Sequence, residues 1–276
     1  MSLQAQSYSG GSYSGGDSYG GGSYNRELVV IGLTSDRRLI SFSESSPDYS
    51  SNLGTVTGLV GGDTSLIGID YRVQDGKLYG VGNGGGVYTL STSNAVATFV
   101  NRLSVALSGT SFGVDFNPVA DRLRIVSDNG QNLRHNVNAG GVTISDGALN
   151  YVAGTPAAGV TGAAYTNNDL DATTATTLYN TDSSLDQVTI QSPPNNGSLA
   201  ATGKLTVDTT PSVGFDIYST IRNNVTVEVQ SLASLTASTG FISLYSVKLP
   251  TGKATLRGTF KSWDKVVDIA IPLNQL

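Results

Sequence analysis

From residue 28 onward the chain alternates short apolar runs with clusters of Gly, Asn, Asp and Ser, a pattern typical of strands joined by tight turns. One unit opens with an apolar run at 66–71 and turns at Asp75-Gly76. Three further runs follow at 77–81, 86–90 and 95–100. This unit therefore predicts four short strands within 35 residues.

The same unit recurs along the chain. Its first strands carry a glycine at the same place, and these glycines are separated by 45, 49 and 52 residues: Gly68, Gly113, Gly162 and Gly214. The later copies open at 112–116, 160–165 and 213–217, with second strands expected at 122–126, 177–180 and 225–229. This spacing suits the four-stranded blade of a β-propeller.

A fifth first strand stands at the C-terminus, at 266–271, and no strands follow it. Three strands without a first strand stand at the other end of the domain, at 28–33, 38–42 and 53–59. Joining these segments completes a fifth blade and removes the open sheet edges of the array. We therefore predict an all-β five-bladed β-propeller closed by the C-terminal strand; the alternative is an open β-sandwich with accidental repeats.

The first 25 residues have a different texture. Residues 7–25 are rich in Gly and Ser, and a tyrosine recurs every five or six residues: Tyr8, Tyr13, Tyr19 and Tyr24. Such a segment has too little apolar surface to fold alone. We expect two units, a low-complexity Gly/Ser/Tyr tail at 1–25 and the propeller at 26–276. The tail is either a flexible linker or an assembly arm whose tyrosines bind a neighbouring surface.

Composition and charge limit the classes of partner and of site that we expect. The chain has 16 basic and 21 acidic residues, and the basic residues are scattered, so we expect no nucleic-acid partner. It has no cysteine, which excludes disulfides and thiolate metal sites. The chain contains no run of eighteen apolar residues, so we expect no membrane insertion. The first six residues lack the features of a secretory signal.

Four aspartates occupy equivalent positions in the first strands, with Ala164 in the remaining blade: Asp70, Asp115, Asp216 and Asp268. At one level of the channel they could hold a calcium ion or a sugar hydroxyl. Side chains of an innermost strand mostly point toward adjacent blades, so we favour a structural role in which each carboxylate accepts hydrogen bonds from backbone amides between blades.

No other constellation indicates catalysis, a metal site or a cofactor. The single histidine, His135, lacks a nucleophile elbow and reads as a strand residue. The polar segments at 82–86, 128–132 and 182–186 fit hairpin turns better than phosphate or calcium loops. The lone tryptophan, Trp263, is expected to be structural, although it could stack on a sugar. We expect no enzymatic activity.

Longer strings within the units resemble the bacterial domain of unknown function 4394, a family grouped with β-propellers. The strings keep the family's order and stand at 108–118, 121–127, 146–151, 162–167 and 193–197. The resemblance covers residues 28–276 and supplies no catalytic residues. It implies an extracellular or cell-surface location, because members of the family look exported or surface-attached.

The sequence thus favours a structural or adhesive propeller that self-associates through its tail, in a filament or on an extracellular matrix. The alternative is a module that binds a glycan, a peptide or a cation at one end of the channel, with the tail as a linker. A carboxylate-based enzyme is the weakest of the three hypotheses.

Overall fold

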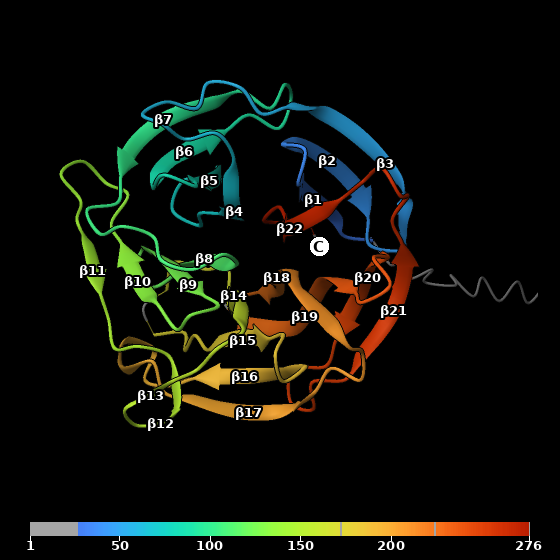
Figure 1. The fold of residues 1–276 in the computed structure, drawn as a ribbon. Helices are drawn as coiled ribbons and strands as arrows, with labels where there is room; N and C mark the ends of the chain where they lie inside the picture. The colour runs from blue at the N-terminus through green and yellow to red at the C-terminus, as the bar shows by residue number, and fades with distance from the viewer. Residues whose placement is uncertain (1–26, 172, 224, 276) are drawn as a thin grey trace, which may run out of the picture.

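A computed structural model describes residues 27–171, 173–223 and 225–275 of the chain. Twenty-two strands account for its regular structure, together with one turn of 3-10 helix at Pro194–Asn196. Five four-stranded antiparallel sheets surround a central axis (Figure 1), so the predicted five-bladed β-propeller is confirmed. The low-complexity tail lies outside the described residues.

Each blade runs from an innermost strand at the axis to an outermost strand at the rim. Blade 1 consists of β22 (Val266–Ala270), β1 (Val29–Thr34), β2 (Arg38–Ser43) and β3 (Ser46–Thr55); blade 2 of β4 (Leu66–Tyr71), β5 (Leu78–Gly82), β6 (Gly86–Leu90) and β7 (Ala97–Arg102). Blade 3 consists of β8 (Phe112–Asn117), β9 (Arg122–Ser127), β10 (Asn132–His135) and β11 (Thr143–Ser145); blade 4 of β14 (Val160–Tyr165), β15 (Leu178–Asp182), β16 (Gln187–Gln191) and β17 (Leu199–Lys204). Blade 5 consists of β18 (Thr209–Arg222), β19 (Val225–Ala237), β20 (Ile242–Val247) and β21 (Ala254–Thr259), and a small hairpin of β12 (Asn150–Val152) and β13 (Thr155–Pro156) lies between blades 3 and 4 in sequence.

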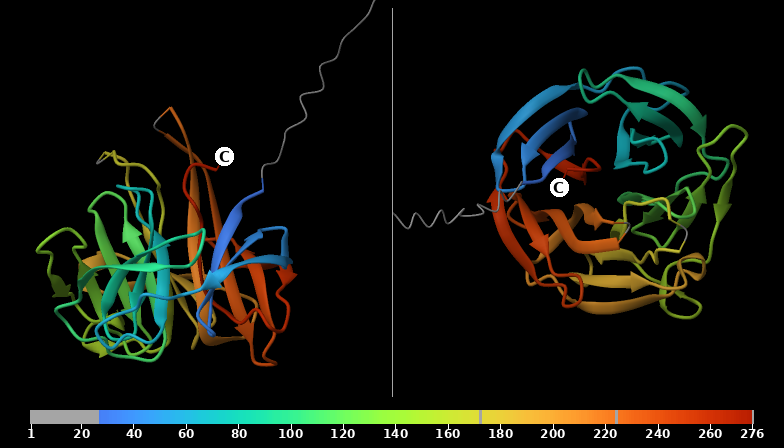
Figure 2. Two further views of the ribbon diagram at one scale, coloured as in Figure 1. Left: turned by 90° about the horizontal axis from the view of Figure 1, so that it is seen from above. Right: turned by 180° about the vertical axis from the view of Figure 1, so that it is seen from behind.

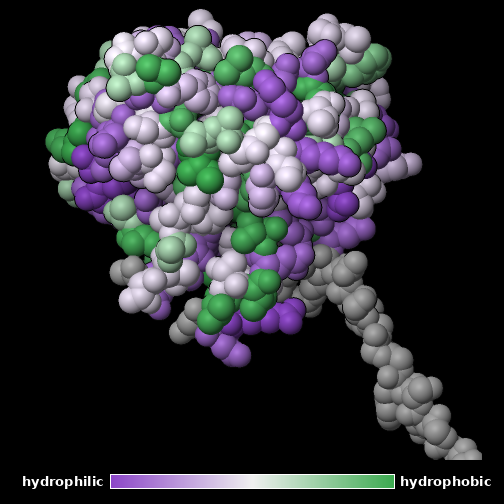
Figure 3. Space-filling model, turned by 90° about the horizontal axis from the view of Figure 1, so that it is seen from below, coloured by the Kyte–Doolittle hydropathy of each residue, from purple (hydrophilic) through white to green (hydrophobic). Residues whose placement is uncertain are grey.

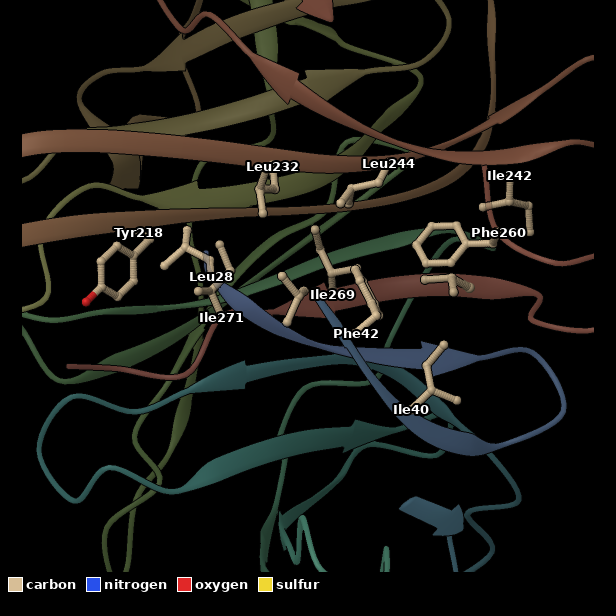
Figure 4. Close-up of a cluster of buried hydrophobic side chains, with 12 residues drawn as sticks. Leu28, Ile40, Phe42, Tyr218, Leu232, Ile242, Leu244, Phe260, Ile269 and Ile271 are labelled. Atoms are coloured by element: carbon tan, nitrogen blue, oxygen red, sulfur yellow. The ribbon is translucent and has the colours of Figure 1, made fainter. Parts of the chain in front are cut away.

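The ring closes within blade 1, as the sequence predicts. The C-terminal strand β22 pairs with β1 in antiparallel register, with Ile31 opposite Ala270 and Leu33 opposite Asp268. Next to this closure, a buried apolar cluster joins blade 1 to blade 5 (Figure 4). In it Phe42 of blade 1 packs edge-on against Phe260, with ring centroids 4.9 Å apart. The closing strand thus completes both a sheet and a core.

The recurring glycines allow the innermost strands to approach one another. A side chain at Gly113 would place its Cβ 2.5 Å from the backbone nitrogen of Ala163 in the next blade. A Cβ at Gly214 would lie 2.6 Å from Cα of Asp268. The repeat therefore carries glycine at these places because backbone from the neighbouring blade occupies the space of a side chain.

Blade 5 differs from the expected unit. Residues 225–229 were expected to form the second strand of the blade, yet β20 pairs only with Leu232–Thr236 of β19. The segment at 225–230 instead pairs with the end of β18 alone, with Ser219 opposite Val229 and Arg222 opposite Val225. Residues 219–223 and 225–230 thus project beyond the propeller as a two-stranded hairpin, which we call the blade 5 arm (Figure 2, left).

The two ends of the propeller are distinct. The described chain begins beside Leu28, where Val29 pairs with Ser43 and exchanges two hydrogen bonds with the Gln275 side chain near the C-terminus. The blade 5 arm projects from this same end (Figure 2, left), which we call the tail end because residues 1–26 join the described chain here. The opposite end, at the turn from Thr34 to Arg38, we call the far end.

Candidate functional site

Four innermost strands place the predicted aspartates inside the channel. Asp70 stands on β4, Asp115 on β8, Asp216 on β18 and Asp268 on β22, and all four side chains are buried. The equivalent residue of blade 4 is Ala164 on β14, also buried.

Each of these carboxylates accepts a hydrogen bond from a backbone amide of the next blade. The donor-to-acceptor distances are 2.7 Å from Phe116 to Asp70, 3.0 Å from Tyr165 to Asp115, 2.6 Å from Ile271 to Asp216 and 2.7 Å from Ile69 to Asp268. These contacts cross four of the five junctions between blades. A buried amide left without an acceptor costs about 1–3 kcal/mol, so each bond holds two blades in register.

The fifth junction, between blades 4 and 5, uses a different contact because Ala164 has no acceptor. Asn167 donates its backbone amide to Oγ of Ser219 over 2.8 Å. Its side-chain oxygen accepts a bond from Thr226 of the blade 5 arm over 2.6 Å. The arm thus contributes to the one junction that lacks a bridge from a first-strand aspartate.

The carboxylates also converge on one another. Asp70, Asp115 and Asp216 each bring an oxygen within 4.8 Å of the others. Burial raises the pKa of Asp70 well above its usual value, and the neighbouring charge of Asp216 adds to the effect. Burial, followed by the charges of Asp70 and Asp216, likewise raises the pKa of Asp115. Burial raises the pKa of Asp268 strongly, with a smaller contribution from the charge of Asp216, and burial raises the pKa of Asp216 to about 6.

Two chemical behaviours are open to this carboxylate cluster. The ion pairs between described residues do not include these four aspartates, so their charges are not balanced by an arginine or lysine. The cluster can retain protons near neutral pH, or it can bind a hard cation such as Ca²⁺ through its oxygens. Ca²⁺ takes six to eight oxygen ligands, so backbone carbonyls or water would have to complete the set.

A cavity of about 500 Å³ opens at the far end of the channel, where the innermost strands begin. Its polar lining is rich in hydroxyl groups: Thr34, Ser35, Ser65, Thr110, Ser111 and Ser212. Arg37 contributes a positive charge, and Leu66, Phe112 and Val213 contribute apolar surface. Hydroxyls beside a cation and an apolar floor suit a sugar or a short peptide. No local pattern in the sequence marks these residues as a site, because they are brought together only by the closed ring.

The single histidine lies in the interior of blade 3. His135 is fully buried, with Nδ1 3.0 Å from Oγ1 of Thr143 and Nε2 2.9 Å from Oδ1 of Asn101. Burial lowers the pKa of His135 to about 4. A neutral imidazole with both nitrogens engaged is a packing residue, and it lies apart from the carboxylate cluster.

The other candidates from the sequence are three polar segments, Trp263 and the tail tyrosines. The segments at 82–86, 128–132 and 182–186 connect second and third strands. Trp263 is 63% exposed, in contrast to the structural packing expected for it. Tyr8, Tyr13, Tyr19 and Tyr24 lie outside the described residues.

A buried carboxylate that the sequence analysis missed is Asp63. Its Oδ2 accepts a bond from the Tyr88 hydroxyl over 2.6 Å and pairs with Arg102 over 2.9 Å. It also accepts the backbone amide of Gly86 over 3.1 Å. These partners fix the β5–β6 turn, and no local pattern in the sequence marks the residue.

Solved structures with a similar arrangement share little sequence with this chain. Glutaminyl cyclase of Myxococcus xanthus is 15% identical, with 74% of this chain and 69% of that chain covered and a TM-score of 0.40. A Bacteroides thetaiotaomicron protein of unknown function is 12% identical over 90% and 67%, with a TM-score of 0.47. A putative 6-phosphogluconolactonase of Bacteroides fragilis is 12% identical over 90% and 99%, with a TM-score of 0.41. Likeness at this level does not bear on activity.

Two further findings complete the comparison. The search of curated proteins found no match, and no helix in the described part of the chain is long and apolar enough to cross a membrane. The family described as "Domain of unknown function (DUF4394)" matches residues 38–270. The chain therefore belongs to the DUF4394 family, as the strings at 108–118 and 162–167 led us to expect.

Proposed function

We propose that this protein is a non-enzymatic structural or adhesive subunit, in which the propeller is a rigid body and the tail mediates self-assembly or attachment to an extracellular matrix. One observation carries the proposal: all five blades are four-stranded without any contribution from residues 1–26. The first described apolar residue, Leu28, is already fully buried. We therefore assign the tail a role in binding a partner.

The chemistry of the tail suits such a role. Tyrosine offers a large, flat contact area with few rotatable bonds, and the flanking Gly and Ser residues let the ring approach a surface closely. Ordering a Gly/Ser chain costs conformational entropy that the tail cannot recover from a core of its own. The free energy must come from a partner, and a second copy of the chain is always available as one.

The test replaces Tyr8, Tyr13, Tyr19 and Tyr24 with Ser in the full chain. We expect the parent to form large species by light scattering and electron microscopy, and the serine variant to be monomeric with an unchanged thermal midpoint. A matched variant with Phe at the same four positions keeps the rings and should still assemble. A parent that stays monomeric at all concentrations, or a serine variant that assembles like the parent, would remove the proposal.

A second candidate function is ligand binding in the channel. It is favoured by the cavity of about 500 Å³ at the far end and by the converging carboxylates of Asp70, Asp115 and Asp216. Calorimetric titration with CaCl₂ and with neutral oligosaccharides tests it directly. A stoichiometric Ca²⁺ transition that disappears in Asp115→Asn would favour this function over a purely structural ring.

A further inference from the structure

An exposed cluster of aromatic side chains lies at the far end of the seam between blades 5 and 1. Tyr49 is 76% exposed, Phe241 66% and Trp263 63%. Lys261 lies between two of them, with Nζ 5.6 Å from the ring centroid of Tyr49 and 5.5 Å from that of Trp263. We call these four residues the aromatic patch. Figure 3 shows one wall of the propeller, on which hydrophobic residues are dispersed among hydrophilic ones.

The patch borders a small recess. A cavity of about 110 Å³ is lined by Phe241, Phe260 and Lys261, together with the two neighbours of Trp263 in sequence. An apolar cavity of roughly 150 Å³ holds benzene in another protein. The recess is thus on the scale of a single aromatic ring, with aromatic faces and an ammonium group at its edge. Aromatic stacking and cation–π attraction make this a site for a planar aromatic group.

The patch lies at the end of the propeller opposite the tail. Trp263 precedes β22, whose first residue Val266 pairs with Thr34 at the far end of β1. Phe241 precedes β20 at the end of β19 remote from the blade 5 arm. The tail joins the other end of β1, and the six residues of β1 span about 20 Å.

We propose that the aromatic patch receives a tyrosine from the tail of a second copy of this chain. This inference rests on the proposed function and names the surface that the tail binds. The described chain begins at the tail end, so the far end of a second copy stacked there would bring its patch next to residue 27. Fully extended, the 26 residues reach about 85–90 Å. Tyr24 lies only three residues from Glu27 and cannot reach its own patch.

The polarity of this contact determines the form of the assembly. Donor and acceptor lie at opposite ends of one subunit, so each subunit binds the next one head to tail. Such a heterologous contact repeats without closing unless its rotation forms a ring. The geometry therefore gives an open linear polymer, with one tail and one patch per junction.

The experiment pairs two variants of the full chain. A patch variant, Phe241→Ser with Trp263→Ala, keeps its tail, and the tail variant with Ser at the four tyrosines keeps its patch. Each should be monomeric alone, with association weakened at least about thirtyfold. Mixed, they should form a one-to-one complex and stop there, because the mixture holds a single competent donor and a single competent acceptor per pair. A mixture that forms no complex would overturn the inference, and so would a parent that stays monomeric while the mixture pairs, because each tail would then bind its own patch.

The single tryptophan gives a direct readout of the site. Emission from the exposed Trp263 should shift to the blue as the parent assembles, and it should stay unchanged with concentration in the tail variant. Neutral oligosaccharides such as cellohexaose serve as the probe for a carbohydrate site. A response to the sugar, with none to chain concentration, would show a glycan platform and overturn the inference.

The blade 5 arm supplies the matched control, because it is a second exposed apolar surface. Its valines at 225, 227 and 229 are exposed, and changing all three to Thr should leave assembly as in the parent. Loss of assembly in this variant, with assembly retained in the patch variant, would place the acceptor on the arm and refute the patch. If the patch variant assembles like the parent and the tail variant does not, the patch is refuted and tail-mediated assembly stands. If the tail variant assembles like the parent, both proposals are refuted.

Discussion

The roles of the channel aspartates as acceptors and as charges can be separated at Asp115. Its carboxylate accepts the Tyr165 amide over 3.0 Å and is 4% exposed. Asp115→Ala leaves that amide unpaired in a buried place, which should lower the free energy of unfolding by about 1–3 kcal/mol. Asp115→Asn keeps an oxygen acceptor and removes a negative charge that repels Asp70 and Asp216. We therefore expect the Asn variant to be at least as stable as the parent at neutral pH.

The pH dependence gives the sign of the charge effect. A raised carboxyl pKa means that the folded state binds more protons than the unfolded state, so stability falls as pH rises through the window. For Asp216 the pH window runs from 3.8 to about 6, and the loss of unfolding free energy across it is roughly 3 kcal/mol. Removing the Asp115 charge should reduce this loss, so the gain of Asp115→Asn over the parent should grow from pH 4 to pH 7.

Urea unfolding at pH 4, 5.5 and 7, with and without EDTA, measures these differences. Asp208→Asn removes an exposed charge and serves as the control for net charge. Equal destabilisation by Asn and Ala at pH 7 would refute the charge argument. A large gain in parent stability with CaCl₂, absent from Asp115→Asn, would instead show that the cluster is a cation site.

Three further outcomes follow from packing and burial. Gly113→Ala should cost about 1–3 kcal/mol of unfolding free energy in urea, because its Cβ meets the Ala163 backbone, and an unchanged midpoint would contradict the close approach. Deleting residues 266–276 removes the closing strand, so the product should be insoluble or bind a hydrophobic dye, and a soluble product with native melting would be inconsistent with closure. The His135 imidazole should show no NMR titration between pH 5 and 8 because its pKa is about 4. Its contribution of about 3 kcal/mol to the free energy of unfolding is full above pH 6.5 and is lost as pH falls toward 4. An imidazole that titrates near pH 6.5 would contradict its burial.

The fold was accessible from the sequence because each of its determinants is local and repeated. Gly113 and Gly214 mark places where the backbones of two blades meet, and the isolated run at 266–271 could complete only the unit at 28–59. The arm was not accessible, because the alternation at 225–229 is the same whether a strand lies inside a blade or extends beyond it. Its position is set by the turn at Asn223 and by the pairing of Ser219 with Val229.

The candidate site was accessible only in part. Equivalent aspartates could be aligned along the repeat, and their contacts to the next blade follow from strand geometry. The approach of Asp70, Asp115 and Asp216 to within 4.8 Å depends on the number of blades and on the diameter of the ring, which no single strand encodes. The exposure of Trp263 was missed because a lone tryptophan is usually buried, and its environment arises from β3, β20 and β21 meeting at one seam.

The pairing of β1 with β22 also constrains how the protein is made. Ile31 and Ala270 are among the first and last structured residues to leave the ribosome, and synthesis at about 5–20 residues per second separates them by tens of seconds. Throughout that interval β1 has β2 on one side and an unpaired edge on the other. The entropy cost of joining ends so far apart grows only with the logarithm of their separation, so closing the ring costs little free energy. Closure nevertheless occurs late, because β22 is made after the other strands. The nascent chain therefore exposes the free edge of β1 until β22 has been synthesised.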